Sequence, residues 1–365
     1  MSRLEERVFW FAWSQVRGLG PILQKRLATH FGSLAAAWEA APEQLEQVEG
    51  IGVRLAQAIA QHRRTVNLTE ILEQESPFLT PADDAYPELL YDIPDPPPVL
   101  YYHGDVSLLS ACQHLPGVGV VGTRVPSDYG KRWTRRITRT ISRAGFLIIS
   151  GLAAGIDREA HRSCLEENGQ TIAVLGTGVN IAYPYRNRDL QQAIARSGLL
   201  LSEHPPGTQP ERIHFPRRNR IIAGLSRATL VMEAPLKSGA LITARLANDY
   251  GRDVFALPGT LDNQCCYGCL ELLSQGAQIV LDENTLITAL GKIPVIQVSS
   301  TPELPELEPH LLEVFQALGM EARSLDAIVQ QVSDQSTGDI LSALTHLELM
   351  GLVSSVPGTQ QYQRC

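Results

Sequence analysis

Seven short apolar runs in the middle of this sequence constrain its fold more than any other feature. The runs end in turn at Gly122, Gly151, Gly176, Glu203, Ala234, Gly259 and Asp282. Segments with the amphipathic pattern of helices, such as YGKRWTRRITRTISRAG, separate most of them. Strands that alternate with helices this regularly predict a doubly wound α/β fold, a parallel sheet with helices on both faces. Ligands of such folds bind beyond the carboxyl ends of the strands, so the residues after each run are site candidates.

A repeat precedes this region. The segment VRGLGPILQKRLATHF from Val16 aligns with VEGIGVRLAQAIAQHR from Val48 at an offset of 32 residues. An apolar–Gly–apolar–Gly turn before a helix is the helix–hairpin–helix pattern, whose exposed backbone N–H groups can hold a phosphate. Glu49 stands in the second turn and the surroundings are acidic. We therefore expect residues 1–80 to form a helical helix–hairpin–helix (SAM-like) domain with a structural role.

The proline-rich segment from Asp92 to Asp105, DIPDPPPVLYYHGD, predicts a connector after the helical domain.

The end of the chain has a winged-helix pattern. Residues 292–305 read as a linker, and three helical segments and a hairpin follow in residues 306–365. A helix that reads DNA carries Lys or Arg toward the phosphates and base edges, but the segment from Thr337 to Met350 has neither. We therefore expect this small domain to be a packing or protein-contact module, and a transcriptional regulator is the weakest of the alternatives.

The charge of the chain is unevenly distributed around its net value of −8. Lys+Arg and Asp+Glu number 8 and 15 in residues 1–114, 20 and 15 in residues 115–290, and 3 and 9 in residues 291–365, so the balances are −7, +5 and −6. A basic middle between acidic ends fits an anion-binding core, although such a charge pattern is more often only a solvated face.

Nothing in the sequence suggests secretion or a membrane. The N-terminus, MSRLEERVFWFAW, has acids before a short aromatic run and no small-residue cleavage site, and no apolar stretch approaches about 18 residues. Six cysteines in a chain of 365 residues fit reduced thiols better than a disulfide framework. We expect a cytoplasmic protein.

Small residues and cations follow several of the apolar runs, which suits an anion-binding edge. The segment HFPRRNR adds arginines whose planar groups match phosphates, beside Phe215, whose ring can stack on any base. In the alternative interpretation Phe215 is a core residue, Asn219 caps a helix, and the arginines pair with Asp189, Glu203 or Glu211. The candidate DNA-binding residues are Gly122, Thr123, Arg124, Gly151, Arg212, Phe215, Arg217, Arg218, Asn219, Arg220, Lys237, Ser238 and Gly239.

Catalytic and metal-binding patterns are weak. Asp157 and His161 share a helix face without a third ligand or a nucleophile nearby, and a structural hydrogen-bonded pair is the better interpretation. The CCYGC segment from Cys265 to Cys269 lacks a fourth zinc ligand and reads as a loop of free thiols. Ser238 lacks a G-x-S-x-G elbow, and there is no P-loop for ATP. We expect no catalytic residue, metal or cofactor.

The order of the segments VVGTR, SGLAAGIDREAH, TIAVLGTGVNIAYP, FPRRNRIIAGL, KSGALITARLA, GRDVFALPG and GAQIV resembles the DNA-processing protein A family (DprA, also called Smf). The resemblance runs from about Asp83 to about Asp282, and the helix–hairpin–helix segment before it also fits. It implies an extended Rossmann-like domain, here residues 81–291, that binds single-stranded DNA. It further implies a homodimer that hands incoming strands to the RecA recombinase during natural transformation, and no reaction.

An enzyme is the second alternative, because this fold resembles that of nucleotide phosphoribohydrolases. Those enzymes carry a P-G-G-x-G-T-x-x-E loop with a catalytic glutamate. The corresponding segment here, PLKSGALITAR, keeps a turn of small residues but has Arg245 where the acid is expected. This difference disfavours hydrolysis.

Overall fold

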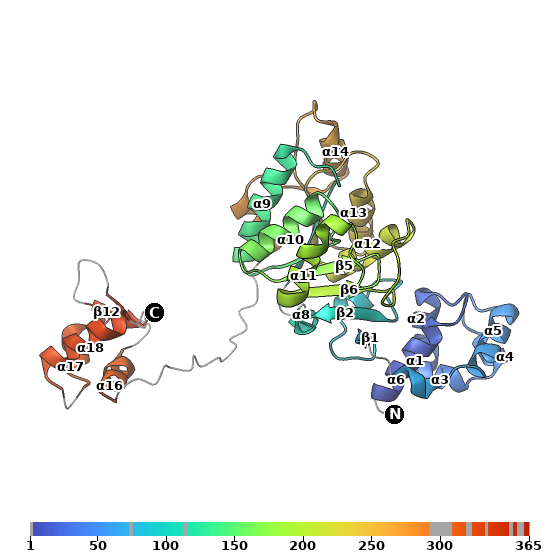
Figure 1. Cartoon of the computed structure of the whole chain (residues 1–365), viewed down its shortest axis with the longest axis horizontal. Coiled ribbons are helices and arrows are strands. Elements are labelled where there is room, and N and C mark those ends of the chain that lie inside the picture. The colour runs from blue at the N-terminus through green and yellow to red at the C-terminus, as the bar shows by residue number, and fades with distance from the viewer. Residues whose placement is uncertain are drawn as a thin grey trace. The chain divides into compact units, whose positions relative to one another are not determined.

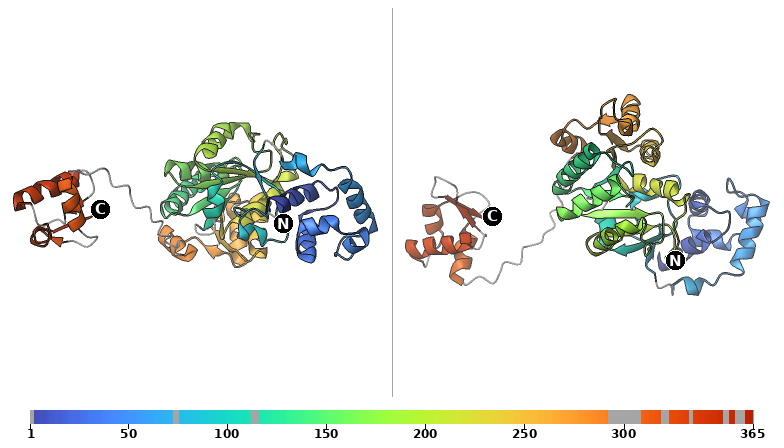
Figure 2. Two further views of the ribbon diagram at one scale, coloured as in Figure 1. Left: turned by 90° about the horizontal axis from the view of Figure 1, so that it is seen from below. Right: turned by 45° about the horizontal axis from the view of Figure 1, so that its top comes forward.

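The computed structural model divides into two compact units, residues 1–295 and residues 296–365, which are described separately (Figures 1 and 2). The parts of the chain that the structure describes are residues 3–72, 76–111, 116–291, 309–318, 323–332, 335–349, 353–355 and 361–364. The expected linker, residues 292–305, lies outside the described residues.

The larger unit is built on a nine-stranded sheet in the order β1-β2-β6-β5-β4-β3-β7-β8-β9. Each of the seven apolar runs contributes one strand, and these seven strands pair in parallel, as the sequence predicts. Strands β3, β4, β5 and β6 are neighbours in chain order, and β7 then pairs with the other side of β3. The parallel strands are β3 (Gly117–Val121), β4 (Leu147–Ser150), β5 (Thr171–Leu175), β6 (Leu199–Ser202), β7 (Ala228–Val231), β8 (Asp253–Ala256) and β9 (Gln278–Ile279).

Two short antiparallel strands extend the sheet at the β6 edge. Strand β1 (Phe78–Leu79) pairs with β2 (Leu100–Gly104), and β2 pairs with β6. The prediction of a connector from Asp92 to Asp105 is therefore wrong for its second half. In the segment LYYHG after the prolines, Leu100 and Tyr102 pack into one hydrophobic cluster and Tyr101 into another, which suits a strand beside β6.

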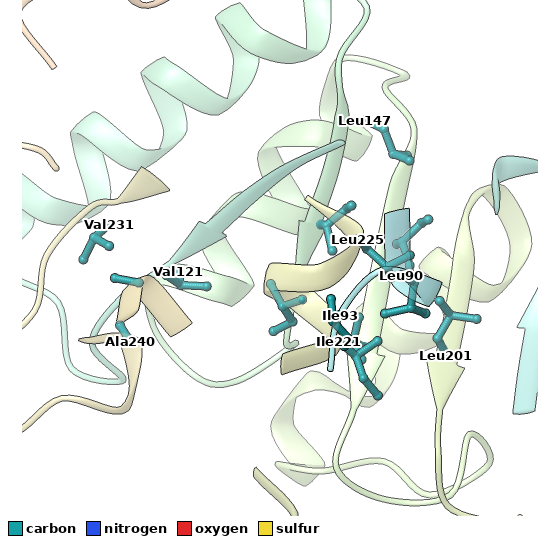
Figure 3. Close-up of a cluster of buried hydrophobic side chains, with 14 of the residues drawn as sticks. Leu90, Ile93, Val121, Leu147, Leu201, Ile221, Leu225, Val231 and Ala240 are labelled. Carbon is teal, nitrogen blue, oxygen red and sulfur yellow. The ribbon is translucent and has the colours of Figure 1, made fainter. Parts of the chain in front are cut away.

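Helices cover both faces of the sheet, which confirms the doubly wound prediction. Successive strand residues enter different clusters, so that Val120 contacts the cores of α9 and α10 while Val121 lies with α12 and α13 on the other face. Figure 3 shows part of this second cluster, including Val121, Ile221, Leu225 and Ala240. One face carries α9 (Asp128–Arg143), α10 (Ile156–Glu166), α11 (Arg188–Ser197) and α15 (Glu283–Leu290), and the other carries α7 (Glu88–Tyr91), α8 (Ser107–Ala111), α12 (His214–Leu225), α13 (Gly239–Asp249) and α14 (Tyr267–Ser274).

Ion pairs account for much of the positive charge of this region. The arginines of α9 lie opposite acids of α10 and α15, with Arg135–Glu159, Arg139–Glu166 and Arg143–Glu167 at 2.6–2.7 Å and Arg136 against Glu283. These pairs lie at the surface, where each one contributes little to stability. The excess of basic residues in this region is therefore a poor guide to where an anion binds.

The N-terminal helices pack against the β1 and β2 edge of the same unit. The Phe11 ring lies 5.0 Å from the Phe78 ring, and Lys25 donates to the carbonyl oxygens of Tyr91 and Ile93. Arg26 donates to the Glu49 carbonyl and pairs with its carboxylate, so the acid in the second hairpin turn has an internal partner. The helices are α1 (Arg3–Ser14), α2 (Pro21–Phe31), α3 (Leu34–Glu39), α4 (Pro42–Leu45), α5 (Val53–Arg63) and α6 (Leu68–Leu72).

The smaller unit has the winged-helix architecture that the sequence predicts. Its strands pair in the order β10-β12-β11, and its helices enclose a core that includes Val314, Ile328, Ile340 and Leu344. Its elements are α16 (Pro309–Ala317), β10 (Arg323–Ser324), α17 (Leu325–Val329), α18 (Thr337–Leu349), β11 (Val353–Ser355) and β12 (Gln361–Arg364).

Candidate nucleic-acid interface

A pocket of about 630 Å³ opens beyond the carboxyl ends of β3 and β7. These two strands are neighbours in the sheet but far apart in the chain, and this topological switch point is where doubly wound folds bind ligands. Nine of the residues predicted from the sequence line the pocket, namely Gly122, Thr123, Arg124, Arg212, Phe215, Arg218, Asn219, Ser238 and Gly239.

A second, smaller pocket of about 230 Å³ adjoins the first. Both pockets are lined by Arg124, Ala153, Tyr183, Phe215 and Arg218. The smaller pocket also includes Gly151, the remaining glycine of the prediction, and it has Arg186 on its lining. Arg217, Arg220 and Lys237 line neither pocket.

The loop after β3 is fixed by backbone hydrogen bonds. The Thr123 N–H donates to the Glu233 carbonyl at 2.7 Å, and the Thr123 carbonyl accepts from the Ile156 N–H at 3.1 Å. These bonds hold the loop between β7 and the start of α10, and the Arg124 side chain is exposed beyond them. Arg124 therefore presents its charge from a backbone that needs little ordering when an anion binds.

Phe215, in the first turn of α12, is neither a core residue nor a fully exposed one. Its ring lies 5.3 Å from the Tyr183 ring at an interplanar angle of 32°, and the Arg124 guanidinium stands over it at 5.5 Å. Gly176 supports the ring from below, since a Cβ at that position would lie 2.9 Å from it. The ring is held in place while part of it stays accessible from both pockets.

Arg218 lies in the floor of the two pockets, where it is 3% exposed. Its guanidinium donates to the carbonyl oxygens of Gly151 and Val174, and a Cβ at Gly151 would overlap it. Burial lowers the pKa of Arg218 to about 10, while the nearby Asp157 carboxylate opposes that shift. Arg218 thus joins α12 to the loop after β4 and to β5, and it stays charged at neutral pH.

The sequence predicts that Arg220 holds a phosphate, but in the structure this residue is buried in an ion pair. It is 6% exposed and forms a bidentate ion pair with Glu203 at 2.8 and 3.0 Å, together with a contact to Asp95 at 3.0 Å. Desolvation of the charged groups makes such burial costly unless the hydrogen bonds are satisfied, as they are here. The alternative, in which Glu203 is the partner of an arginine of this segment, therefore describes Arg220.

Three further predicted cations stay at the surface. Arg212, Arg217 and Lys237 are exposed, and among the residues that the structure describes none of them forms an ion pair. Arg212 lines the larger pocket, whereas Arg217 and Lys237 flank it on α12 and on the loop before α13. Free cations of this kind, beside helix starts, attract anions.

Asn219 and Ser238 join the helices that border the larger pocket. The Asn219 side-chain amide donates to the Gly239 carbonyl at 3.2 Å, so Asn219 bridges α12 and α13 rather than capping a helix. The Ser238 hydroxyl caps α13 by accepting from the Ala240 N–H at 3.3 Å. Both side chains therefore help to keep the pocket open at a fixed width.

Glu233, which the sequence reasoning missed, is a fully buried acid at the end of β7. Its carboxylate accepts from the backbone N–H and the hydroxyl of Ser127 at 2.8 and 2.6 Å, and from the Asn263 amide at 3.0 Å. It therefore fixes the start of α9 and the approach to α14 around the loop that carries Arg124. The signal was an acid at the end of the apolar run ATLVMEA.

The weaker candidates have structural surroundings. The Asp157 carboxylate accepts from the N–H groups of Gly151 and Ala153, while His161 bonds Thr171 at 2.7 Å, so the two are not the hydrogen-bonded pair that we expected. Cys265 and Cys266 lie in the 3-10 helix η2 (Gln264–Cys266) and Cys269 lies in α14, so this segment is helical rather than a loop.

The four described cysteines are free. Among the described residues, no group of three or more His, Cys, Asp or Glu side chains is arranged to hold a metal ion. Within those same residues, no helix has the length and apolar character needed to cross a membrane.

Comparison with known families and proteins identifies relatives along the whole chain. A family model described as DNA recombination-mediator protein A matches residues 77–291, a DprA winged helix domain matches residues 298–359, and a helix-hairpin-helix motif matches residues 9–72. Protein Smf of Synechocystis sp. is 49% identical over 98% of this chain and 99% of its own length. Protein Smf of Escherichia coli is 38% identical over 79% of this chain and 78% of its own length.

Two solved structures are also similar. The DNA processing protein A of Streptococcus pneumoniae superposes with a TM-score of 0.67 and 33% identity, covering 78% of this chain and 97% of that one. The DNA processing protein A of Helicobacter pylori, whose structure describes a single-stranded DNA binding mode, gives a TM-score of 0.53 and 33% identity, covering 59% and 96%.

Proposed function

Because the chain belongs to the DNA processing protein A family (DprA, also called Smf), we propose that it binds single-stranded DNA at the pocket beyond β3 and β7. The observation that carries the proposal is the half-buried Phe215 ring with Arg124 over it. An aromatic ring beside a fixed cation can stack on a base while the phosphate next to that base is neutralised.

The residues around the pocket take different parts in this binding. Arg124, Arg212, Arg217 and Lys237 are exposed and would contact phosphates, which gives affinity without sequence preference. Phe215 would stack on a base. Arg218 is a positioning residue, since its hydrogen bonds hold the loop after β4 in the floor of the pocket.

Single strands suit this arrangement better than duplexes. The Phe215 ring is recessed between Tyr183 and Gly176, so a base must leave its own stack to reach it. Bases of a duplex are paired and stacked, and removing one costs a few kcal/mol, whereas a single strand supplies unstacked bases.

We also propose the finer functions that the family resemblance implies. The bound strand is handed to the RecA recombinase during natural transformation, the protein acts as a homodimer, and its role is binding rather than catalysis. The transfer of the strand to RecA is tested by measuring RecA filament formation on strands that a single-strand binding protein already covers. Faster filament growth with this protein present supports it, and unchanged growth contradicts it.

Salt-titrated binding of single- and double-stranded oligonucleotides of equal length tests DNA binding itself. If exposed cations neutralise about three to four phosphates, log K for the single strand falls with log salt concentration at a slope near −2 to −3. Tighter binding of the duplex would contradict the proposal and favour a regulator.

A further inference from the structure

The segment from Tyr183 to Arg188, YPYRNR, was not among the sequence candidates and borders the smaller pocket. It contains the 3-10 helix η1 (Tyr185–Asn187) before α11. Tyr183, Pro184 and Arg186 line the pocket, and the Tyr185 ring is 73% exposed beside them. A tyrosine so exposed buries little apolar surface, so its contribution to folding is small.

Buried side chains hold this segment in place. The Asn187 amide, 1% exposed, donates to the carbonyl oxygens of Leu152 and Ala153 at 2.9 and 3.3 Å, in the loop after β4. Gln191, also buried, donates to the Val179 carbonyl at 2.9 Å. Tyr183 adds its contact with Phe215 at 5.3 Å. The exposed Tyr185 and Arg186 are therefore presented from a fixed backbone, which lowers the entropic cost of binding a ligand.

The exposed cations of this segment have no acidic partner. Arg186 and Arg188 are exposed, and within the described ranges neither one forms an ion pair, although Asp189 follows directly in the chain. The Arg188 guanidinium instead lies 5.9 Å from the Tyr185 ring and donates to its hydroxyl at 3.2 Å. One part of the Tyr185 ring is thus supported by a cation while most of the side chain stays accessible.

The lining of the smaller pocket is mainly apolar. Its walls include Ala154, Leu175 and Val125, and Val125 is 79% exposed at the end of the loop after β3. A mainly apolar cavity that also has cations on its lining and an exposed apolar side chain beside it is typical of a ligand site. A volume of about 230 Å³ is on the scale of one nucleobase rather than a stretch of chain.

We propose that the smaller pocket and the segment from Tyr183 to Arg188 form a second nucleotide site of the single strand. A base that follows the one on Phe215 enters this pocket, Arg186 contacts the adjoining phosphate, and the next base stacks on the Tyr185 ring. The strand then runs from the larger pocket across Phe215 and out over η1. This inference rests on the proposed binding of single-stranded DNA at Phe215.

Binding of short and long oligothymidylates by the full-length protein tests the second site. Strands of about 2 nucleotides that bind at Phe215 are too short to place a third base on Tyr185, and strands of about 12 nucleotides reach it. With Tyr185→Leu, affinity for the long strand should fall about five-fold or more, the loss of one stacked base, while affinity for the short strand stays unchanged. With Arg186→Ala, the salt slope for the long strand should flatten by about 0.7.

Arg196→Ala is the matched control. Arg196 is also exposed and lies on the same helix, α11, but in its last turn, just before β6 begins. It is therefore near the amino ends of the strands, whereas the pockets lie beyond their carboxyl ends. It should leave both strands unaffected. Equal losses on the short and long strands, or wild-type affinity of Tyr185→Leu for the long strand, would overturn the second site. Absence of binding by the unmodified protein would instead contradict the proposed function.

Discussion

The Arg124 guanidinium lies 5.5 Å from the centroid of the Phe215 ring, so a fixed cation and an aromatic surface from distant parts of the chain meet at one point. Arg124 comes from the loop after β3, and Phe215 comes from the first turn of α12. The two side chains lie on the boundary between the two pockets. Substitutions of these residues should therefore separate charge from stacking.

Replacing Arg124 with alanine should weaken binding of all single strands alike and flatten the salt slope by about 0.7, because one phosphate contact is lost. Fluorescence anisotropy at several salt concentrations measures both quantities. The same change at Arg196, which is exposed near the amino ends of the strands, should alter neither. A slope that Arg124→Ala leaves unchanged would mean that this arginine does not contact the DNA.

Replacing Phe215 with leucine should lower affinity by about 1–3 kcal/mol without changing the salt slope, because a stacking surface is lost and no charge is removed. The ring is half-buried against Tyr183 and Gly176, so the free energy of unfolding should fall by less than about 1.5 kcal/mol. Denaturant titration and binding on the same preparation compare the two effects. Normal affinity in this variant would refute stacking and leave the arginines to account for the site.

The parallel sheet was predictable because strands buried on both faces form continuous apolar runs, such as TIAVL in β5. Strand β2 was missed because it comes directly after prolines, which normally mark a connector. The helical periodicity of α12 could have indicated that Arg218 is buried. It stands three and four residues before Ile221 and Ile222, which are buried, so it belongs to the inward stripe of α12.

The sequence offered Glu203 as one possible partner of the arginines in HFPRRNR, but it could not assign that partner to Arg220. Arg220 is buried because Glu203 and Asp95 lie opposite it, and nothing local in HFPRRNR distinguishes it from the exposed Arg217. The exposed cations of the site could be recognised as basic residues but not as unpaired ones. Ion pairs such as Arg135–Glu159 form between α9 and α10, and only the fold brings those helices together.

Replacing Arg220 with methionine should lower the free energy of unfolding by about 3 kcal/mol, because Glu203 loses its bidentate partner and Asp95 loses its cation. Arg217→Ala, three residues earlier and exposed, should change stability by less than about 0.5 kcal/mol. Urea denaturation of both variants measures the difference.

The double variant Arg220→Met with Glu203→Gln isolates the charge effect. It should recover part of the lost stability, because the largely buried Glu203 carboxylate that remained without its partner is removed as well. Equal stabilities of Arg220→Met and Arg217→Ala would show that the buried ion pair contributes nothing measurable.

Acid should destabilise the larger unit through His161, whose burial lowers its pKa from 6.5 to about 3. Below pH 6.5 the unfolded chain binds a proton at His161 that the folded protein does not bind. The contribution of His161 to the free energy of unfolding is therefore fully present above pH 6.5 and is lost progressively as the pH decreases toward 3. Between about pH 7 and pH 5 this one group should cost about 2 kcal/mol. In His161→Asn, which lacks the titrating ring, that loss should disappear, while Asp157 and the other groups titrate in both proteins. Denaturant unfolding at several pH values should therefore show a stability difference between the two proteins that narrows in acid. A constant difference would mean that His161 has the same pKa in the folded protein as in the unfolded chain.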